Sequence, residues 1–109
     1  MAEKDAQEKI RRLQVMEQNV QQVLAQKQQF QSQVFELEKA LKEIKATSAA
    51  YKIVGGIMVL SDREQLEKEL LQQKELADLR VATLDKQEKQ IREKAQSLQK
   101  DVMTLLQKE

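Results

Sequence analysis

The feature that most constrains the fold of this chain is a heptad pattern that occurs twice, once on each side of a Gly-Gly pair. In the first half, apolar residues recur at spacings of three and four, with Lys27 as the polar exception: Leu13, Met16, Val20, Val23, Phe30, Val34, Leu37, Leu41 and Ile44. The second half repeats this spacing, with Glu88 as the exception: Ala77, Val81, Leu84, Ile91, Ala95, Leu98, Val102 and Leu105. An average repeat of 3.5 residues is typical of coiled-coil helices, whose a and d positions form one narrow apolar stripe. We call this stripe the seam.

The composition agrees with a protein built from long helices. The chain has 109 residues, of which 34% are charged and 3% aromatic, and it contains no Pro, Cys, Trp or His. A globular core needs more bulky side chains and more turns than this sequence offers. We therefore predict a mainly α fold with a single domain over residues 1–109, made of a helix over 4–46, a β-hairpin over 50–60 and a helix over 62–108. Either Asp62 with Gln65, or Ser61 with Glu64, caps the second helix.

The two seams predict an antiparallel pair of helices in one register. If facing residues have numbers that add to 111, Leu13 meets Leu98 and Met16 meets Ala95, and each a position meets a d position. The centre of this symmetry lies between Gly55 and Gly56. The same centre pairs the strands of a two-residue hairpin, whose turn requires the positive φ angles that glycine adopts. Seam and hairpin therefore predict the same register independently.

Four polar residues fall on the predicted seam: Lys27, Glu67, Lys74 and Glu88. One interpretation is that their long stems cover an apolar partner while the charges reach water. The other is that they fix the register of the two helices.

The hairpin is apolar on both faces apart from Lys52, and an isolated two-stranded hairpin is marginal in water. Its unpaired edges favour pairing with further strands. We therefore predict that it assembles with other copies or related chains into a sheet or barrel, through Tyr51, Ile53, Val54, Gly55, Gly56, Ile57, Met58, Val59 and Leu60. The alternative is that it folds over the helix ends as a cap.

Three segments resemble the β-class subunit of prefoldin, most closely its archaeal form. They are Tyr51-Lys52-x-Val54-Gly55 running into Ile57-Met58-Val59, QKQ at 26–28 leading to LEKALKEI at 37–44, and DKQEKQIREK at 85–94. The resemblance covers nearly the whole chain, and one hairpin between two helices is similar to the β class because the α class carries two.

This resemblance implies a cytoplasmic, ATP-independent chaperone (a holdase) without a cofactor. It further implies a hexamer of two alpha and four beta subunits, whose hairpins join into a platform of β-barrels. The distal ends of its coiled coils then hold unfolded client proteins and pass them to a group II chaperonin.

By this resemblance both chain termini correspond to the client-binding tip. The local pattern agrees, because apolar residues there extend beyond the seam at Ile10, Val15, Met103 and Leu106. With Leu13, Met16, Leu98, Val102 and Leu105 they would form an adaptable apolar clasp. The alternative role for each of these residues is ordinary packing in the seam. For Ile10, Val15, Met103 and Leu106, which lie off the seam, we favour client contact.

Other classes of function find little support in the sequence. The net charge of +1 gives no strong field for nucleic acid, no apolar run is long enough to span a membrane, and the N-terminus is too polar for a signal peptide. Without His or Cys the chain offers no metal-ligand cluster and no evident enzyme site, and Gly55-Gly56 lacks a phosphate-binding pattern. The remaining alternative is a purely structural coiled-coil scaffold or tether without chaperone activity.

Overall fold

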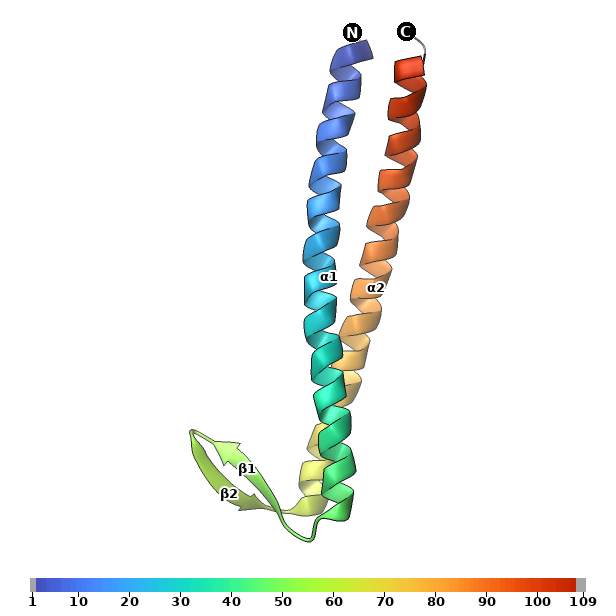
Figure 1. Cartoon of the computed structure of the whole chain (residues 1–109). Helices are drawn as coiled ribbons and strands as arrows, with labels where there is room; N and C mark the ends of the chain where they lie inside the picture. The colour runs from blue at the N-terminus through green and yellow to red at the C-terminus, as the bar shows by residue number, and fades with distance from the viewer. Residues whose placement is uncertain (1, 108–109) are drawn as a thin grey trace. The chain divides into compact units, whose positions relative to one another are not determined.

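The computed structural model describes residues 2–107, which form two long helices joined by a hairpin (Figure 1). Helix α1 spans Ala2–Ala46, strand β1 Ala50–Val54, strand β2 Ile57–Ser61 and helix α2 Arg63–Gln107. The helices run antiparallel, so the predicted fold class is confirmed. Helix α1 begins two residues before the predicted start, and α2 begins one residue after it. Residue 108, the predicted end of the second helix, lies outside the described residues.

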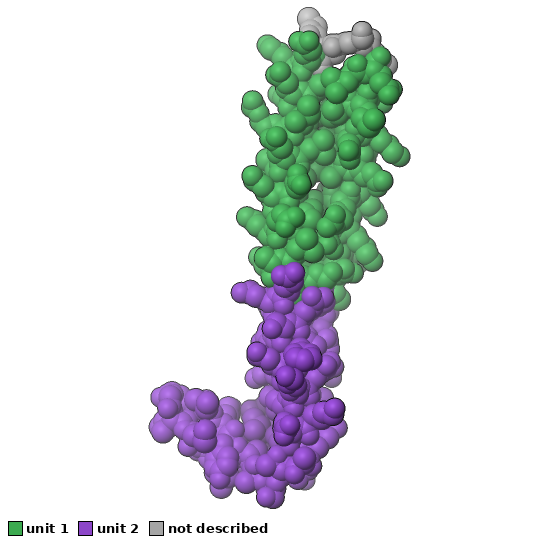
Figure 2. All heavy atoms as spheres, viewed as in Figure 1, with its two compact units in different colours: residues 1–27, 82–109 green, residues 28–81 purple. Residues whose placement is uncertain are grey.

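The chain divides into two compact units (Figure 2). Unit 1 holds residues 1–27 and 82–109, and its described residues are the terminal parts of the two helices. Unit 2 holds residues 28–81, which are the hairpin and the helical segments that flank it. Whether the whole chain folds as one domain stays a prediction.

The buried residues of both helices lie on the seam. In unit 1 they are Ala6, Val20, Leu84 and Val102, and in unit 2 they are Leu37, Ile44 and Ala77, with Ala50 at the base of the hairpin. Ala6 stands one heptad before Leu13 and thus extends the predicted seam toward the N-terminus. The pattern of burial follows from the sequence, because a two-helix pair can cover only the a and d positions of each partner.

Cross-helix contacts in each unit agree with the predicted register to within one residue. In unit 1 the Lys27 ammonium meets the Asp85 carboxylate, and in unit 2 Lys74 lies beside Glu38. The guanidinium of Arg80 lies over the ring of Phe30, 5.9 Å from its centroid.

The hairpin has the predicted register and turn. Tyr51 pairs with Leu60 and Val54 with Ile57. Gly55 and Gly56 have φ angles of 56° and 82°, the left-handed values that a two-residue turn of this kind requires.

Polar groups close the junctions between the hairpin and the helices. The Asp62 carboxylate accepts a hydrogen bond from the backbone N–H of Glu64 at 3.3 Å, so Asp62 is the N-cap of α2. The guanidinium of Arg63 donates to the backbone carbonyls of Thr47 at 3.1 Å and Lys45 at 3.5 Å. Arg63 therefore satisfies carbonyl groups that the end of α1 leaves without a helical partner.

Candidate functional site

The exposed large apolar side chains are confined to particular stretches of the chain. Four lie near the helix termini in unit 1, namely Ile10, Val15, Met103 and Leu106. Seven lie in the hairpin, namely Tyr51, Ile53, Val54, Ile57, Met58, Val59 and Leu60. Four lie on the helices of unit 2, namely Phe35, Leu71, Leu76 and Leu79. Residues 16–34 and 80–102, both wholly described, contain none. A protein rarely gathers apolar surface in this way unless a partner covers it.

The two faces of the hairpin differ. Side chains of cross-strand partners point to the same face, so Tyr51, Ile53, Met58 and Leu60 share one face, and each is 57–72% exposed. Apart from the phenolic hydroxyl of Tyr51, this face is apolar.

The opposite face of the hairpin is tied to α2 at its base. Ala50 is buried, and the Lys52 ammonium lies 3.1 Å from the Glu69 carboxylate of α2. Toward the turn this face is open, with Val54 and Ile57 more than half exposed. The ion pair links the hairpin to α2, and large apolar side chains on both faces of the hairpin remain exposed.

The residues predicted for the client-binding tip fall into two groups. Ile10, Val15, Met103 and Leu106 are 40–55% exposed, as their off-seam positions imply. Leu13, Met16, Leu98 and Leu105 are half-buried, and Val102 is buried in the seam. A client would reach Val102 only if the two helices separated.

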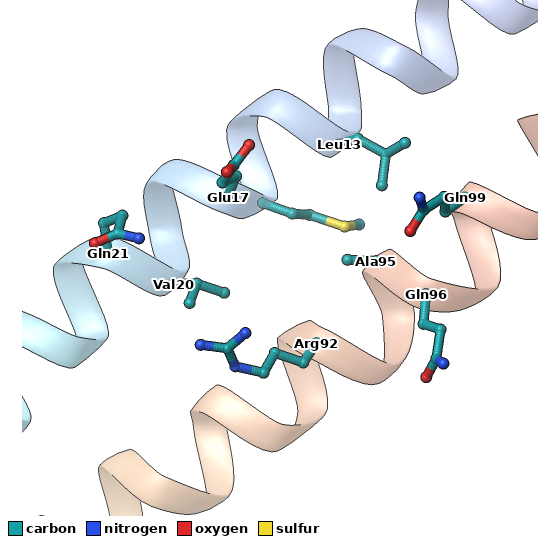
Figure 3. A pocket seen from close by; sticks show the side chains of 9 residues that line it. Leu13, Glu17, Val20, Gln21, Arg92, Ala95, Gln96 and Gln99 are labelled. Carbon is teal, nitrogen blue, oxygen red and sulfur yellow. The ribbon is translucent and has the colours of Figure 1, made fainter.

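Unit 1 also contains an open groove of about 600 Å³ along the pair of helices (Figure 3). Its floor consists of seam residues from both helices: Leu13, Met16, Val20 and Ala95. Its rim is polar, with Glu17 and Gln21 on α1 and with Arg92, Gln96 and Gln99 on α2. The groove exists because Ala95 is too small to fill the space opposite Met16. Sequence reasoning missed it, although an alanine at a seam position was the available signal.

A charged cluster crosses the seam in unit 1, at Lys27. Its ammonium lies 2.8 Å from an oxygen of Asp85 and 3.7 Å from one of Glu88, both on α2. Arg92 and Lys89 pair in turn with Glu88 at 3.4 Å and with Asp85 at 3.6 Å. The Lys27 hydrogen bond lowers the pKa of the Asp85 carboxyl, and the same bond raises the pKa of Lys27. The Lys27 charge therefore ends on carboxylates of the other helix, which favours the register-fixing interpretation.

The described part of the chain offers no sign of metal chemistry or of a membrane span. Residues 2–107 contain no group of three His, Cys, Asp or Glu side chains placed to hold a metal ion. Neither α1 nor α2, over its described length, contains a stretch apolar enough to cross a membrane.

Comparisons with known proteins point to one family. Residues 7–109 match the family Prefoldin_2, described as "Prefoldin subunit". The chain is 37% identical over 100 residues to the prefoldin subunit beta of Sulfurisphaera tokodaii, covering 89% of this chain and 80% of that protein. It is 34% identical over 114 residues to the prefoldin subunit beta of Saccharolobus islandicus, covering 99% and 90% of the two chains.

A solved structure has the same fold. The crystal structure of the prefoldin beta subunit from Thermococcus strain KS-1 superposes with a TM-score of 0.87 at 30% identity, covering 92% of this chain and 90% of that chain. Both the sequence relatives and this structure are beta subunits. The chain belongs to the prefoldin family of chaperone subunits.

Proposed function

We propose that this chain is an ATP-independent holdase subunit, which holds non-native proteins at its helix termini and joins other subunits through its hairpin. The observation that carries the proposal is the distribution of exposed apolar side chains, which gather near the termini and in unit 2 and are absent from residues 16–34 and 80–102. A tether would need a coiled coil alone and would gain nothing from exposed apolar residues at the helix termini.

The client surface contains the four exposed residues Ile10, Val15, Met103 and Leu106, with the half-buried residues Leu13, Met16, Leu98 and Leu105 beside them. Partly exposed leucine and isoleucine side chains attract apolar segments without selecting a sequence. Met16 and Met103 add side chains that adapt to irregular surfaces. Val102 becomes part of this surface when the ends of the two helices separate. Terminal segments separate at a low free-energy cost.

The assembly surface is the hairpin, from Tyr51 to Leu60. Its two strands leave outer edges for pairing, and its face of Tyr51, Ile53, Met58 and Leu60 supplies the mainly apolar interior that a β-barrel of several hairpins needs. Membership of the prefoldin family supports other prefoldin subunits as the partners. We propose that they form a hexamer of two alpha and four beta subunits.

Three further parts of the proposal rest on the family. The complex works in the cytoplasm, it passes its clients to a group II chaperonin, and it does so without a cofactor. Holding a client by apolar contact requires no bond making, so the subunit needs no catalytic residue and we propose that it is not an enzyme.

The test replaces the exposed residues Ile10, Val15, Met103 and Leu106 by Ser in the assembled protein. The variant should need about tenfold more protein than the wild type for half-suppression of the aggregation of a heat-denatured client, because it loses exposed apolar area at the termini. Light scattering measures the suppression, and native mass spectrometry should show an unchanged oligomer.

A matched variant with Leu71 and Leu76 changed to Ser removes exposed apolar area outside the termini and should keep full suppression. Equal suppression by the wild type and by the variant with four serines would contradict the proposed client surface. A wild type that suppresses no aggregation would favour the tether.

A further inference from the structure

The groove of unit 1 lies on one particular side of the helix pair. Counting from the a position at Leu13, Glu17 is an e position, and from the d position at Ile91, Arg92 and Gln99 are e positions too. In an antiparallel pair the e positions of both helices flank the seam on the same side, because each helix is reversed relative to the other. We call this side the e side.

Three of the four exposed terminal residues extend the groove along the e side. Ile10 and Leu106 are e positions, and Met103, a b position, follows Gln99 by one turn. Val15, a c position, points to the opposite side. An apolar strip thus continues from the groove floor toward the described helix termini along the e side.

The dimensions of this strip match a short helix. From Ile10 to Gln21 it covers 12 residues of α1, about 17 Å at 1.5 Å per residue, and from Arg92 to Leu106 it covers 15 residues of α2, about 21 Å. This length corresponds to three to four helical turns.

The chemistry of the walls favours a helix over an extended chain as the occupant. Both walls are helices, whose backbone N–H and C=O groups are already bonded within each helix. An extended segment in this groove would bury its own backbone groups without partners, whereas a helix satisfies them internally.

The rim is compatible with clients of varied sequence. It carries one negative charge at Glu17, one positive charge at Arg92 and three glutamine amides, which both donate and accept hydrogen bonds (Figure 3). Such a rim can meet the flanks of an amphipathic helix of either charge.

We propose that the e side of unit 1 binds an amphipathic helical segment of a non-native protein, which packs against Leu13, Met16 and Ala95 as a third helix. The e and b positions then become partly buried, as in a three-stranded helical bundle. This inference rests on the proposed function and adds the conformational class of the client segment.

The test uses the assembled protein and two capped, fluorescein-labelled peptides of about 18 residues with identical composition. One peptide places leucines at spacings of three and four, and the other alternates leucine with polar residues. Fluorescence anisotropy should show about tenfold tighter binding of the first peptide. When the same peptide is labelled with ¹³C, its carbonyl chemical shifts should move on binding to values typical of an α-helix.

Variants locate the binding. Changing Ile10, Met103 and Leu106 together to Gln should weaken binding of the helical peptide about tenfold, whereas Leu76→Gln, at an exposed position in unit 2, should change it less than about twofold. All four side chains are exposed, so the substitutions leave the seam unchanged, and circular dichroism checks the helix content.

Four results would overturn the inference: equal binding of the two peptides, a bound peptide that is not helical, an equal effect of Leu76→Gln, or a concentration-dependent self-association of the subunit that the triple variant abolishes and that the peptide does not inhibit. The last result would assign the e side to a second copy of the chain. In each case the proposed function would still stand if the wild type suppresses the aggregation of a client. The proposed function would fail if the wild type does not suppress it.

Discussion

At the residue scale, the polar members of the seam show what a heptad pattern leaves open. The pattern predicts that Lys27 lies on the seam opposite Leu84, and the structure places its mostly buried side chain with the ammonium on Asp85, the next residue of α2. A lysine side chain has several rotatable bonds, so a sequence period fixes where its stem starts and not where its charge ends. The partner was therefore beyond prediction, although the seam position was predicted.

The Lys27–Asp85 pair should make stability depend on pH in the acid range. Because the pKa of Asp85 is lowered in the folded state, its contribution is present above the ordinary carboxyl value of 3.8 and is lost as the pH falls through the lower folded value. Asp85→Asn should reduce the thermal unfolding midpoint by about 1–3 °C at pH 7, and this difference should shrink as the pH falls below 3.8. Thermal unfolding followed by circular dichroism measures both values.

The control for this prediction is Lys27→Met. In that background Asp85→Asn should have a smaller effect at pH 7, since the cross-helix partner is gone and only the exposed Lys89 still pairs with Asp85. A difference between wild type and Asp85→Asn that persists unchanged to pH 2 would assign the effect to some other property of the substitution.

At the element scale, the hairpin was predicted residue by residue, whereas the groove was not. Two constraints coincide at the hairpin, because the symmetry of the seams and the Gly-Gly turn both place its centre between Gly55 and Gly56. The groove arises from the volume that Ala95 leaves empty between two helices, and a binary apolar pattern scores alanine like leucine. Side-chain volume, rather than polarity, is what sequence reasoning lacked there.

The turn should be sensitive to backbone conformation alone. A Cβ added at Gly55 would meet no atom within 4 Å, so Gly55→Ala costs only the left-handed φ angle, about 1 kcal/mol. Gly55→Asn should cost clearly less, because asparagine tolerates this region. Chemical denaturation of the assembled protein compares the two variants, and equal losses would indicate that the turn does not hold this conformation in solution.

At the scale of the whole molecule, the sequence predicted which segments expose apolar side chains that a partner could cover. The fold class and the apolar excess of the hairpin and termini were predicted from the pattern, and the structure confirms the exposure of these residues. Subunit number and client identity depend on surfaces of other chains, which no single sequence encodes.

Assembly should depend on apolar contact at the hairpin. Ile53 and Val59 lie on opposite faces of it, so Ile53→Asp with Val59→Asp places charge on both surfaces that would be buried. This variant should sediment as free subunits when mixed with its partner subunits, under conditions where the wild type forms one large species. Analytical ultracentrifugation measures the difference.

The matched control replaces the same two residues by Thr, which keeps the β-branched shape and adds no charge. It should retain most of the assembled species. A hexamer undisturbed by the two aspartates would refute the role of the hairpin in the barrel.

The position of Tyr51 has a practical consequence. The chain contains one tyrosine and no tryptophan, and the phenol ring stands on the exposed apolar face of the hairpin. Its ultraviolet emission therefore comes almost wholly from this one strand, and a change in intensity or anisotropy on mixing subunits would signal docking at the hairpin. Capture of a tyrosine-free polypeptide near the termini should leave this intrinsic, label-free signal unchanged.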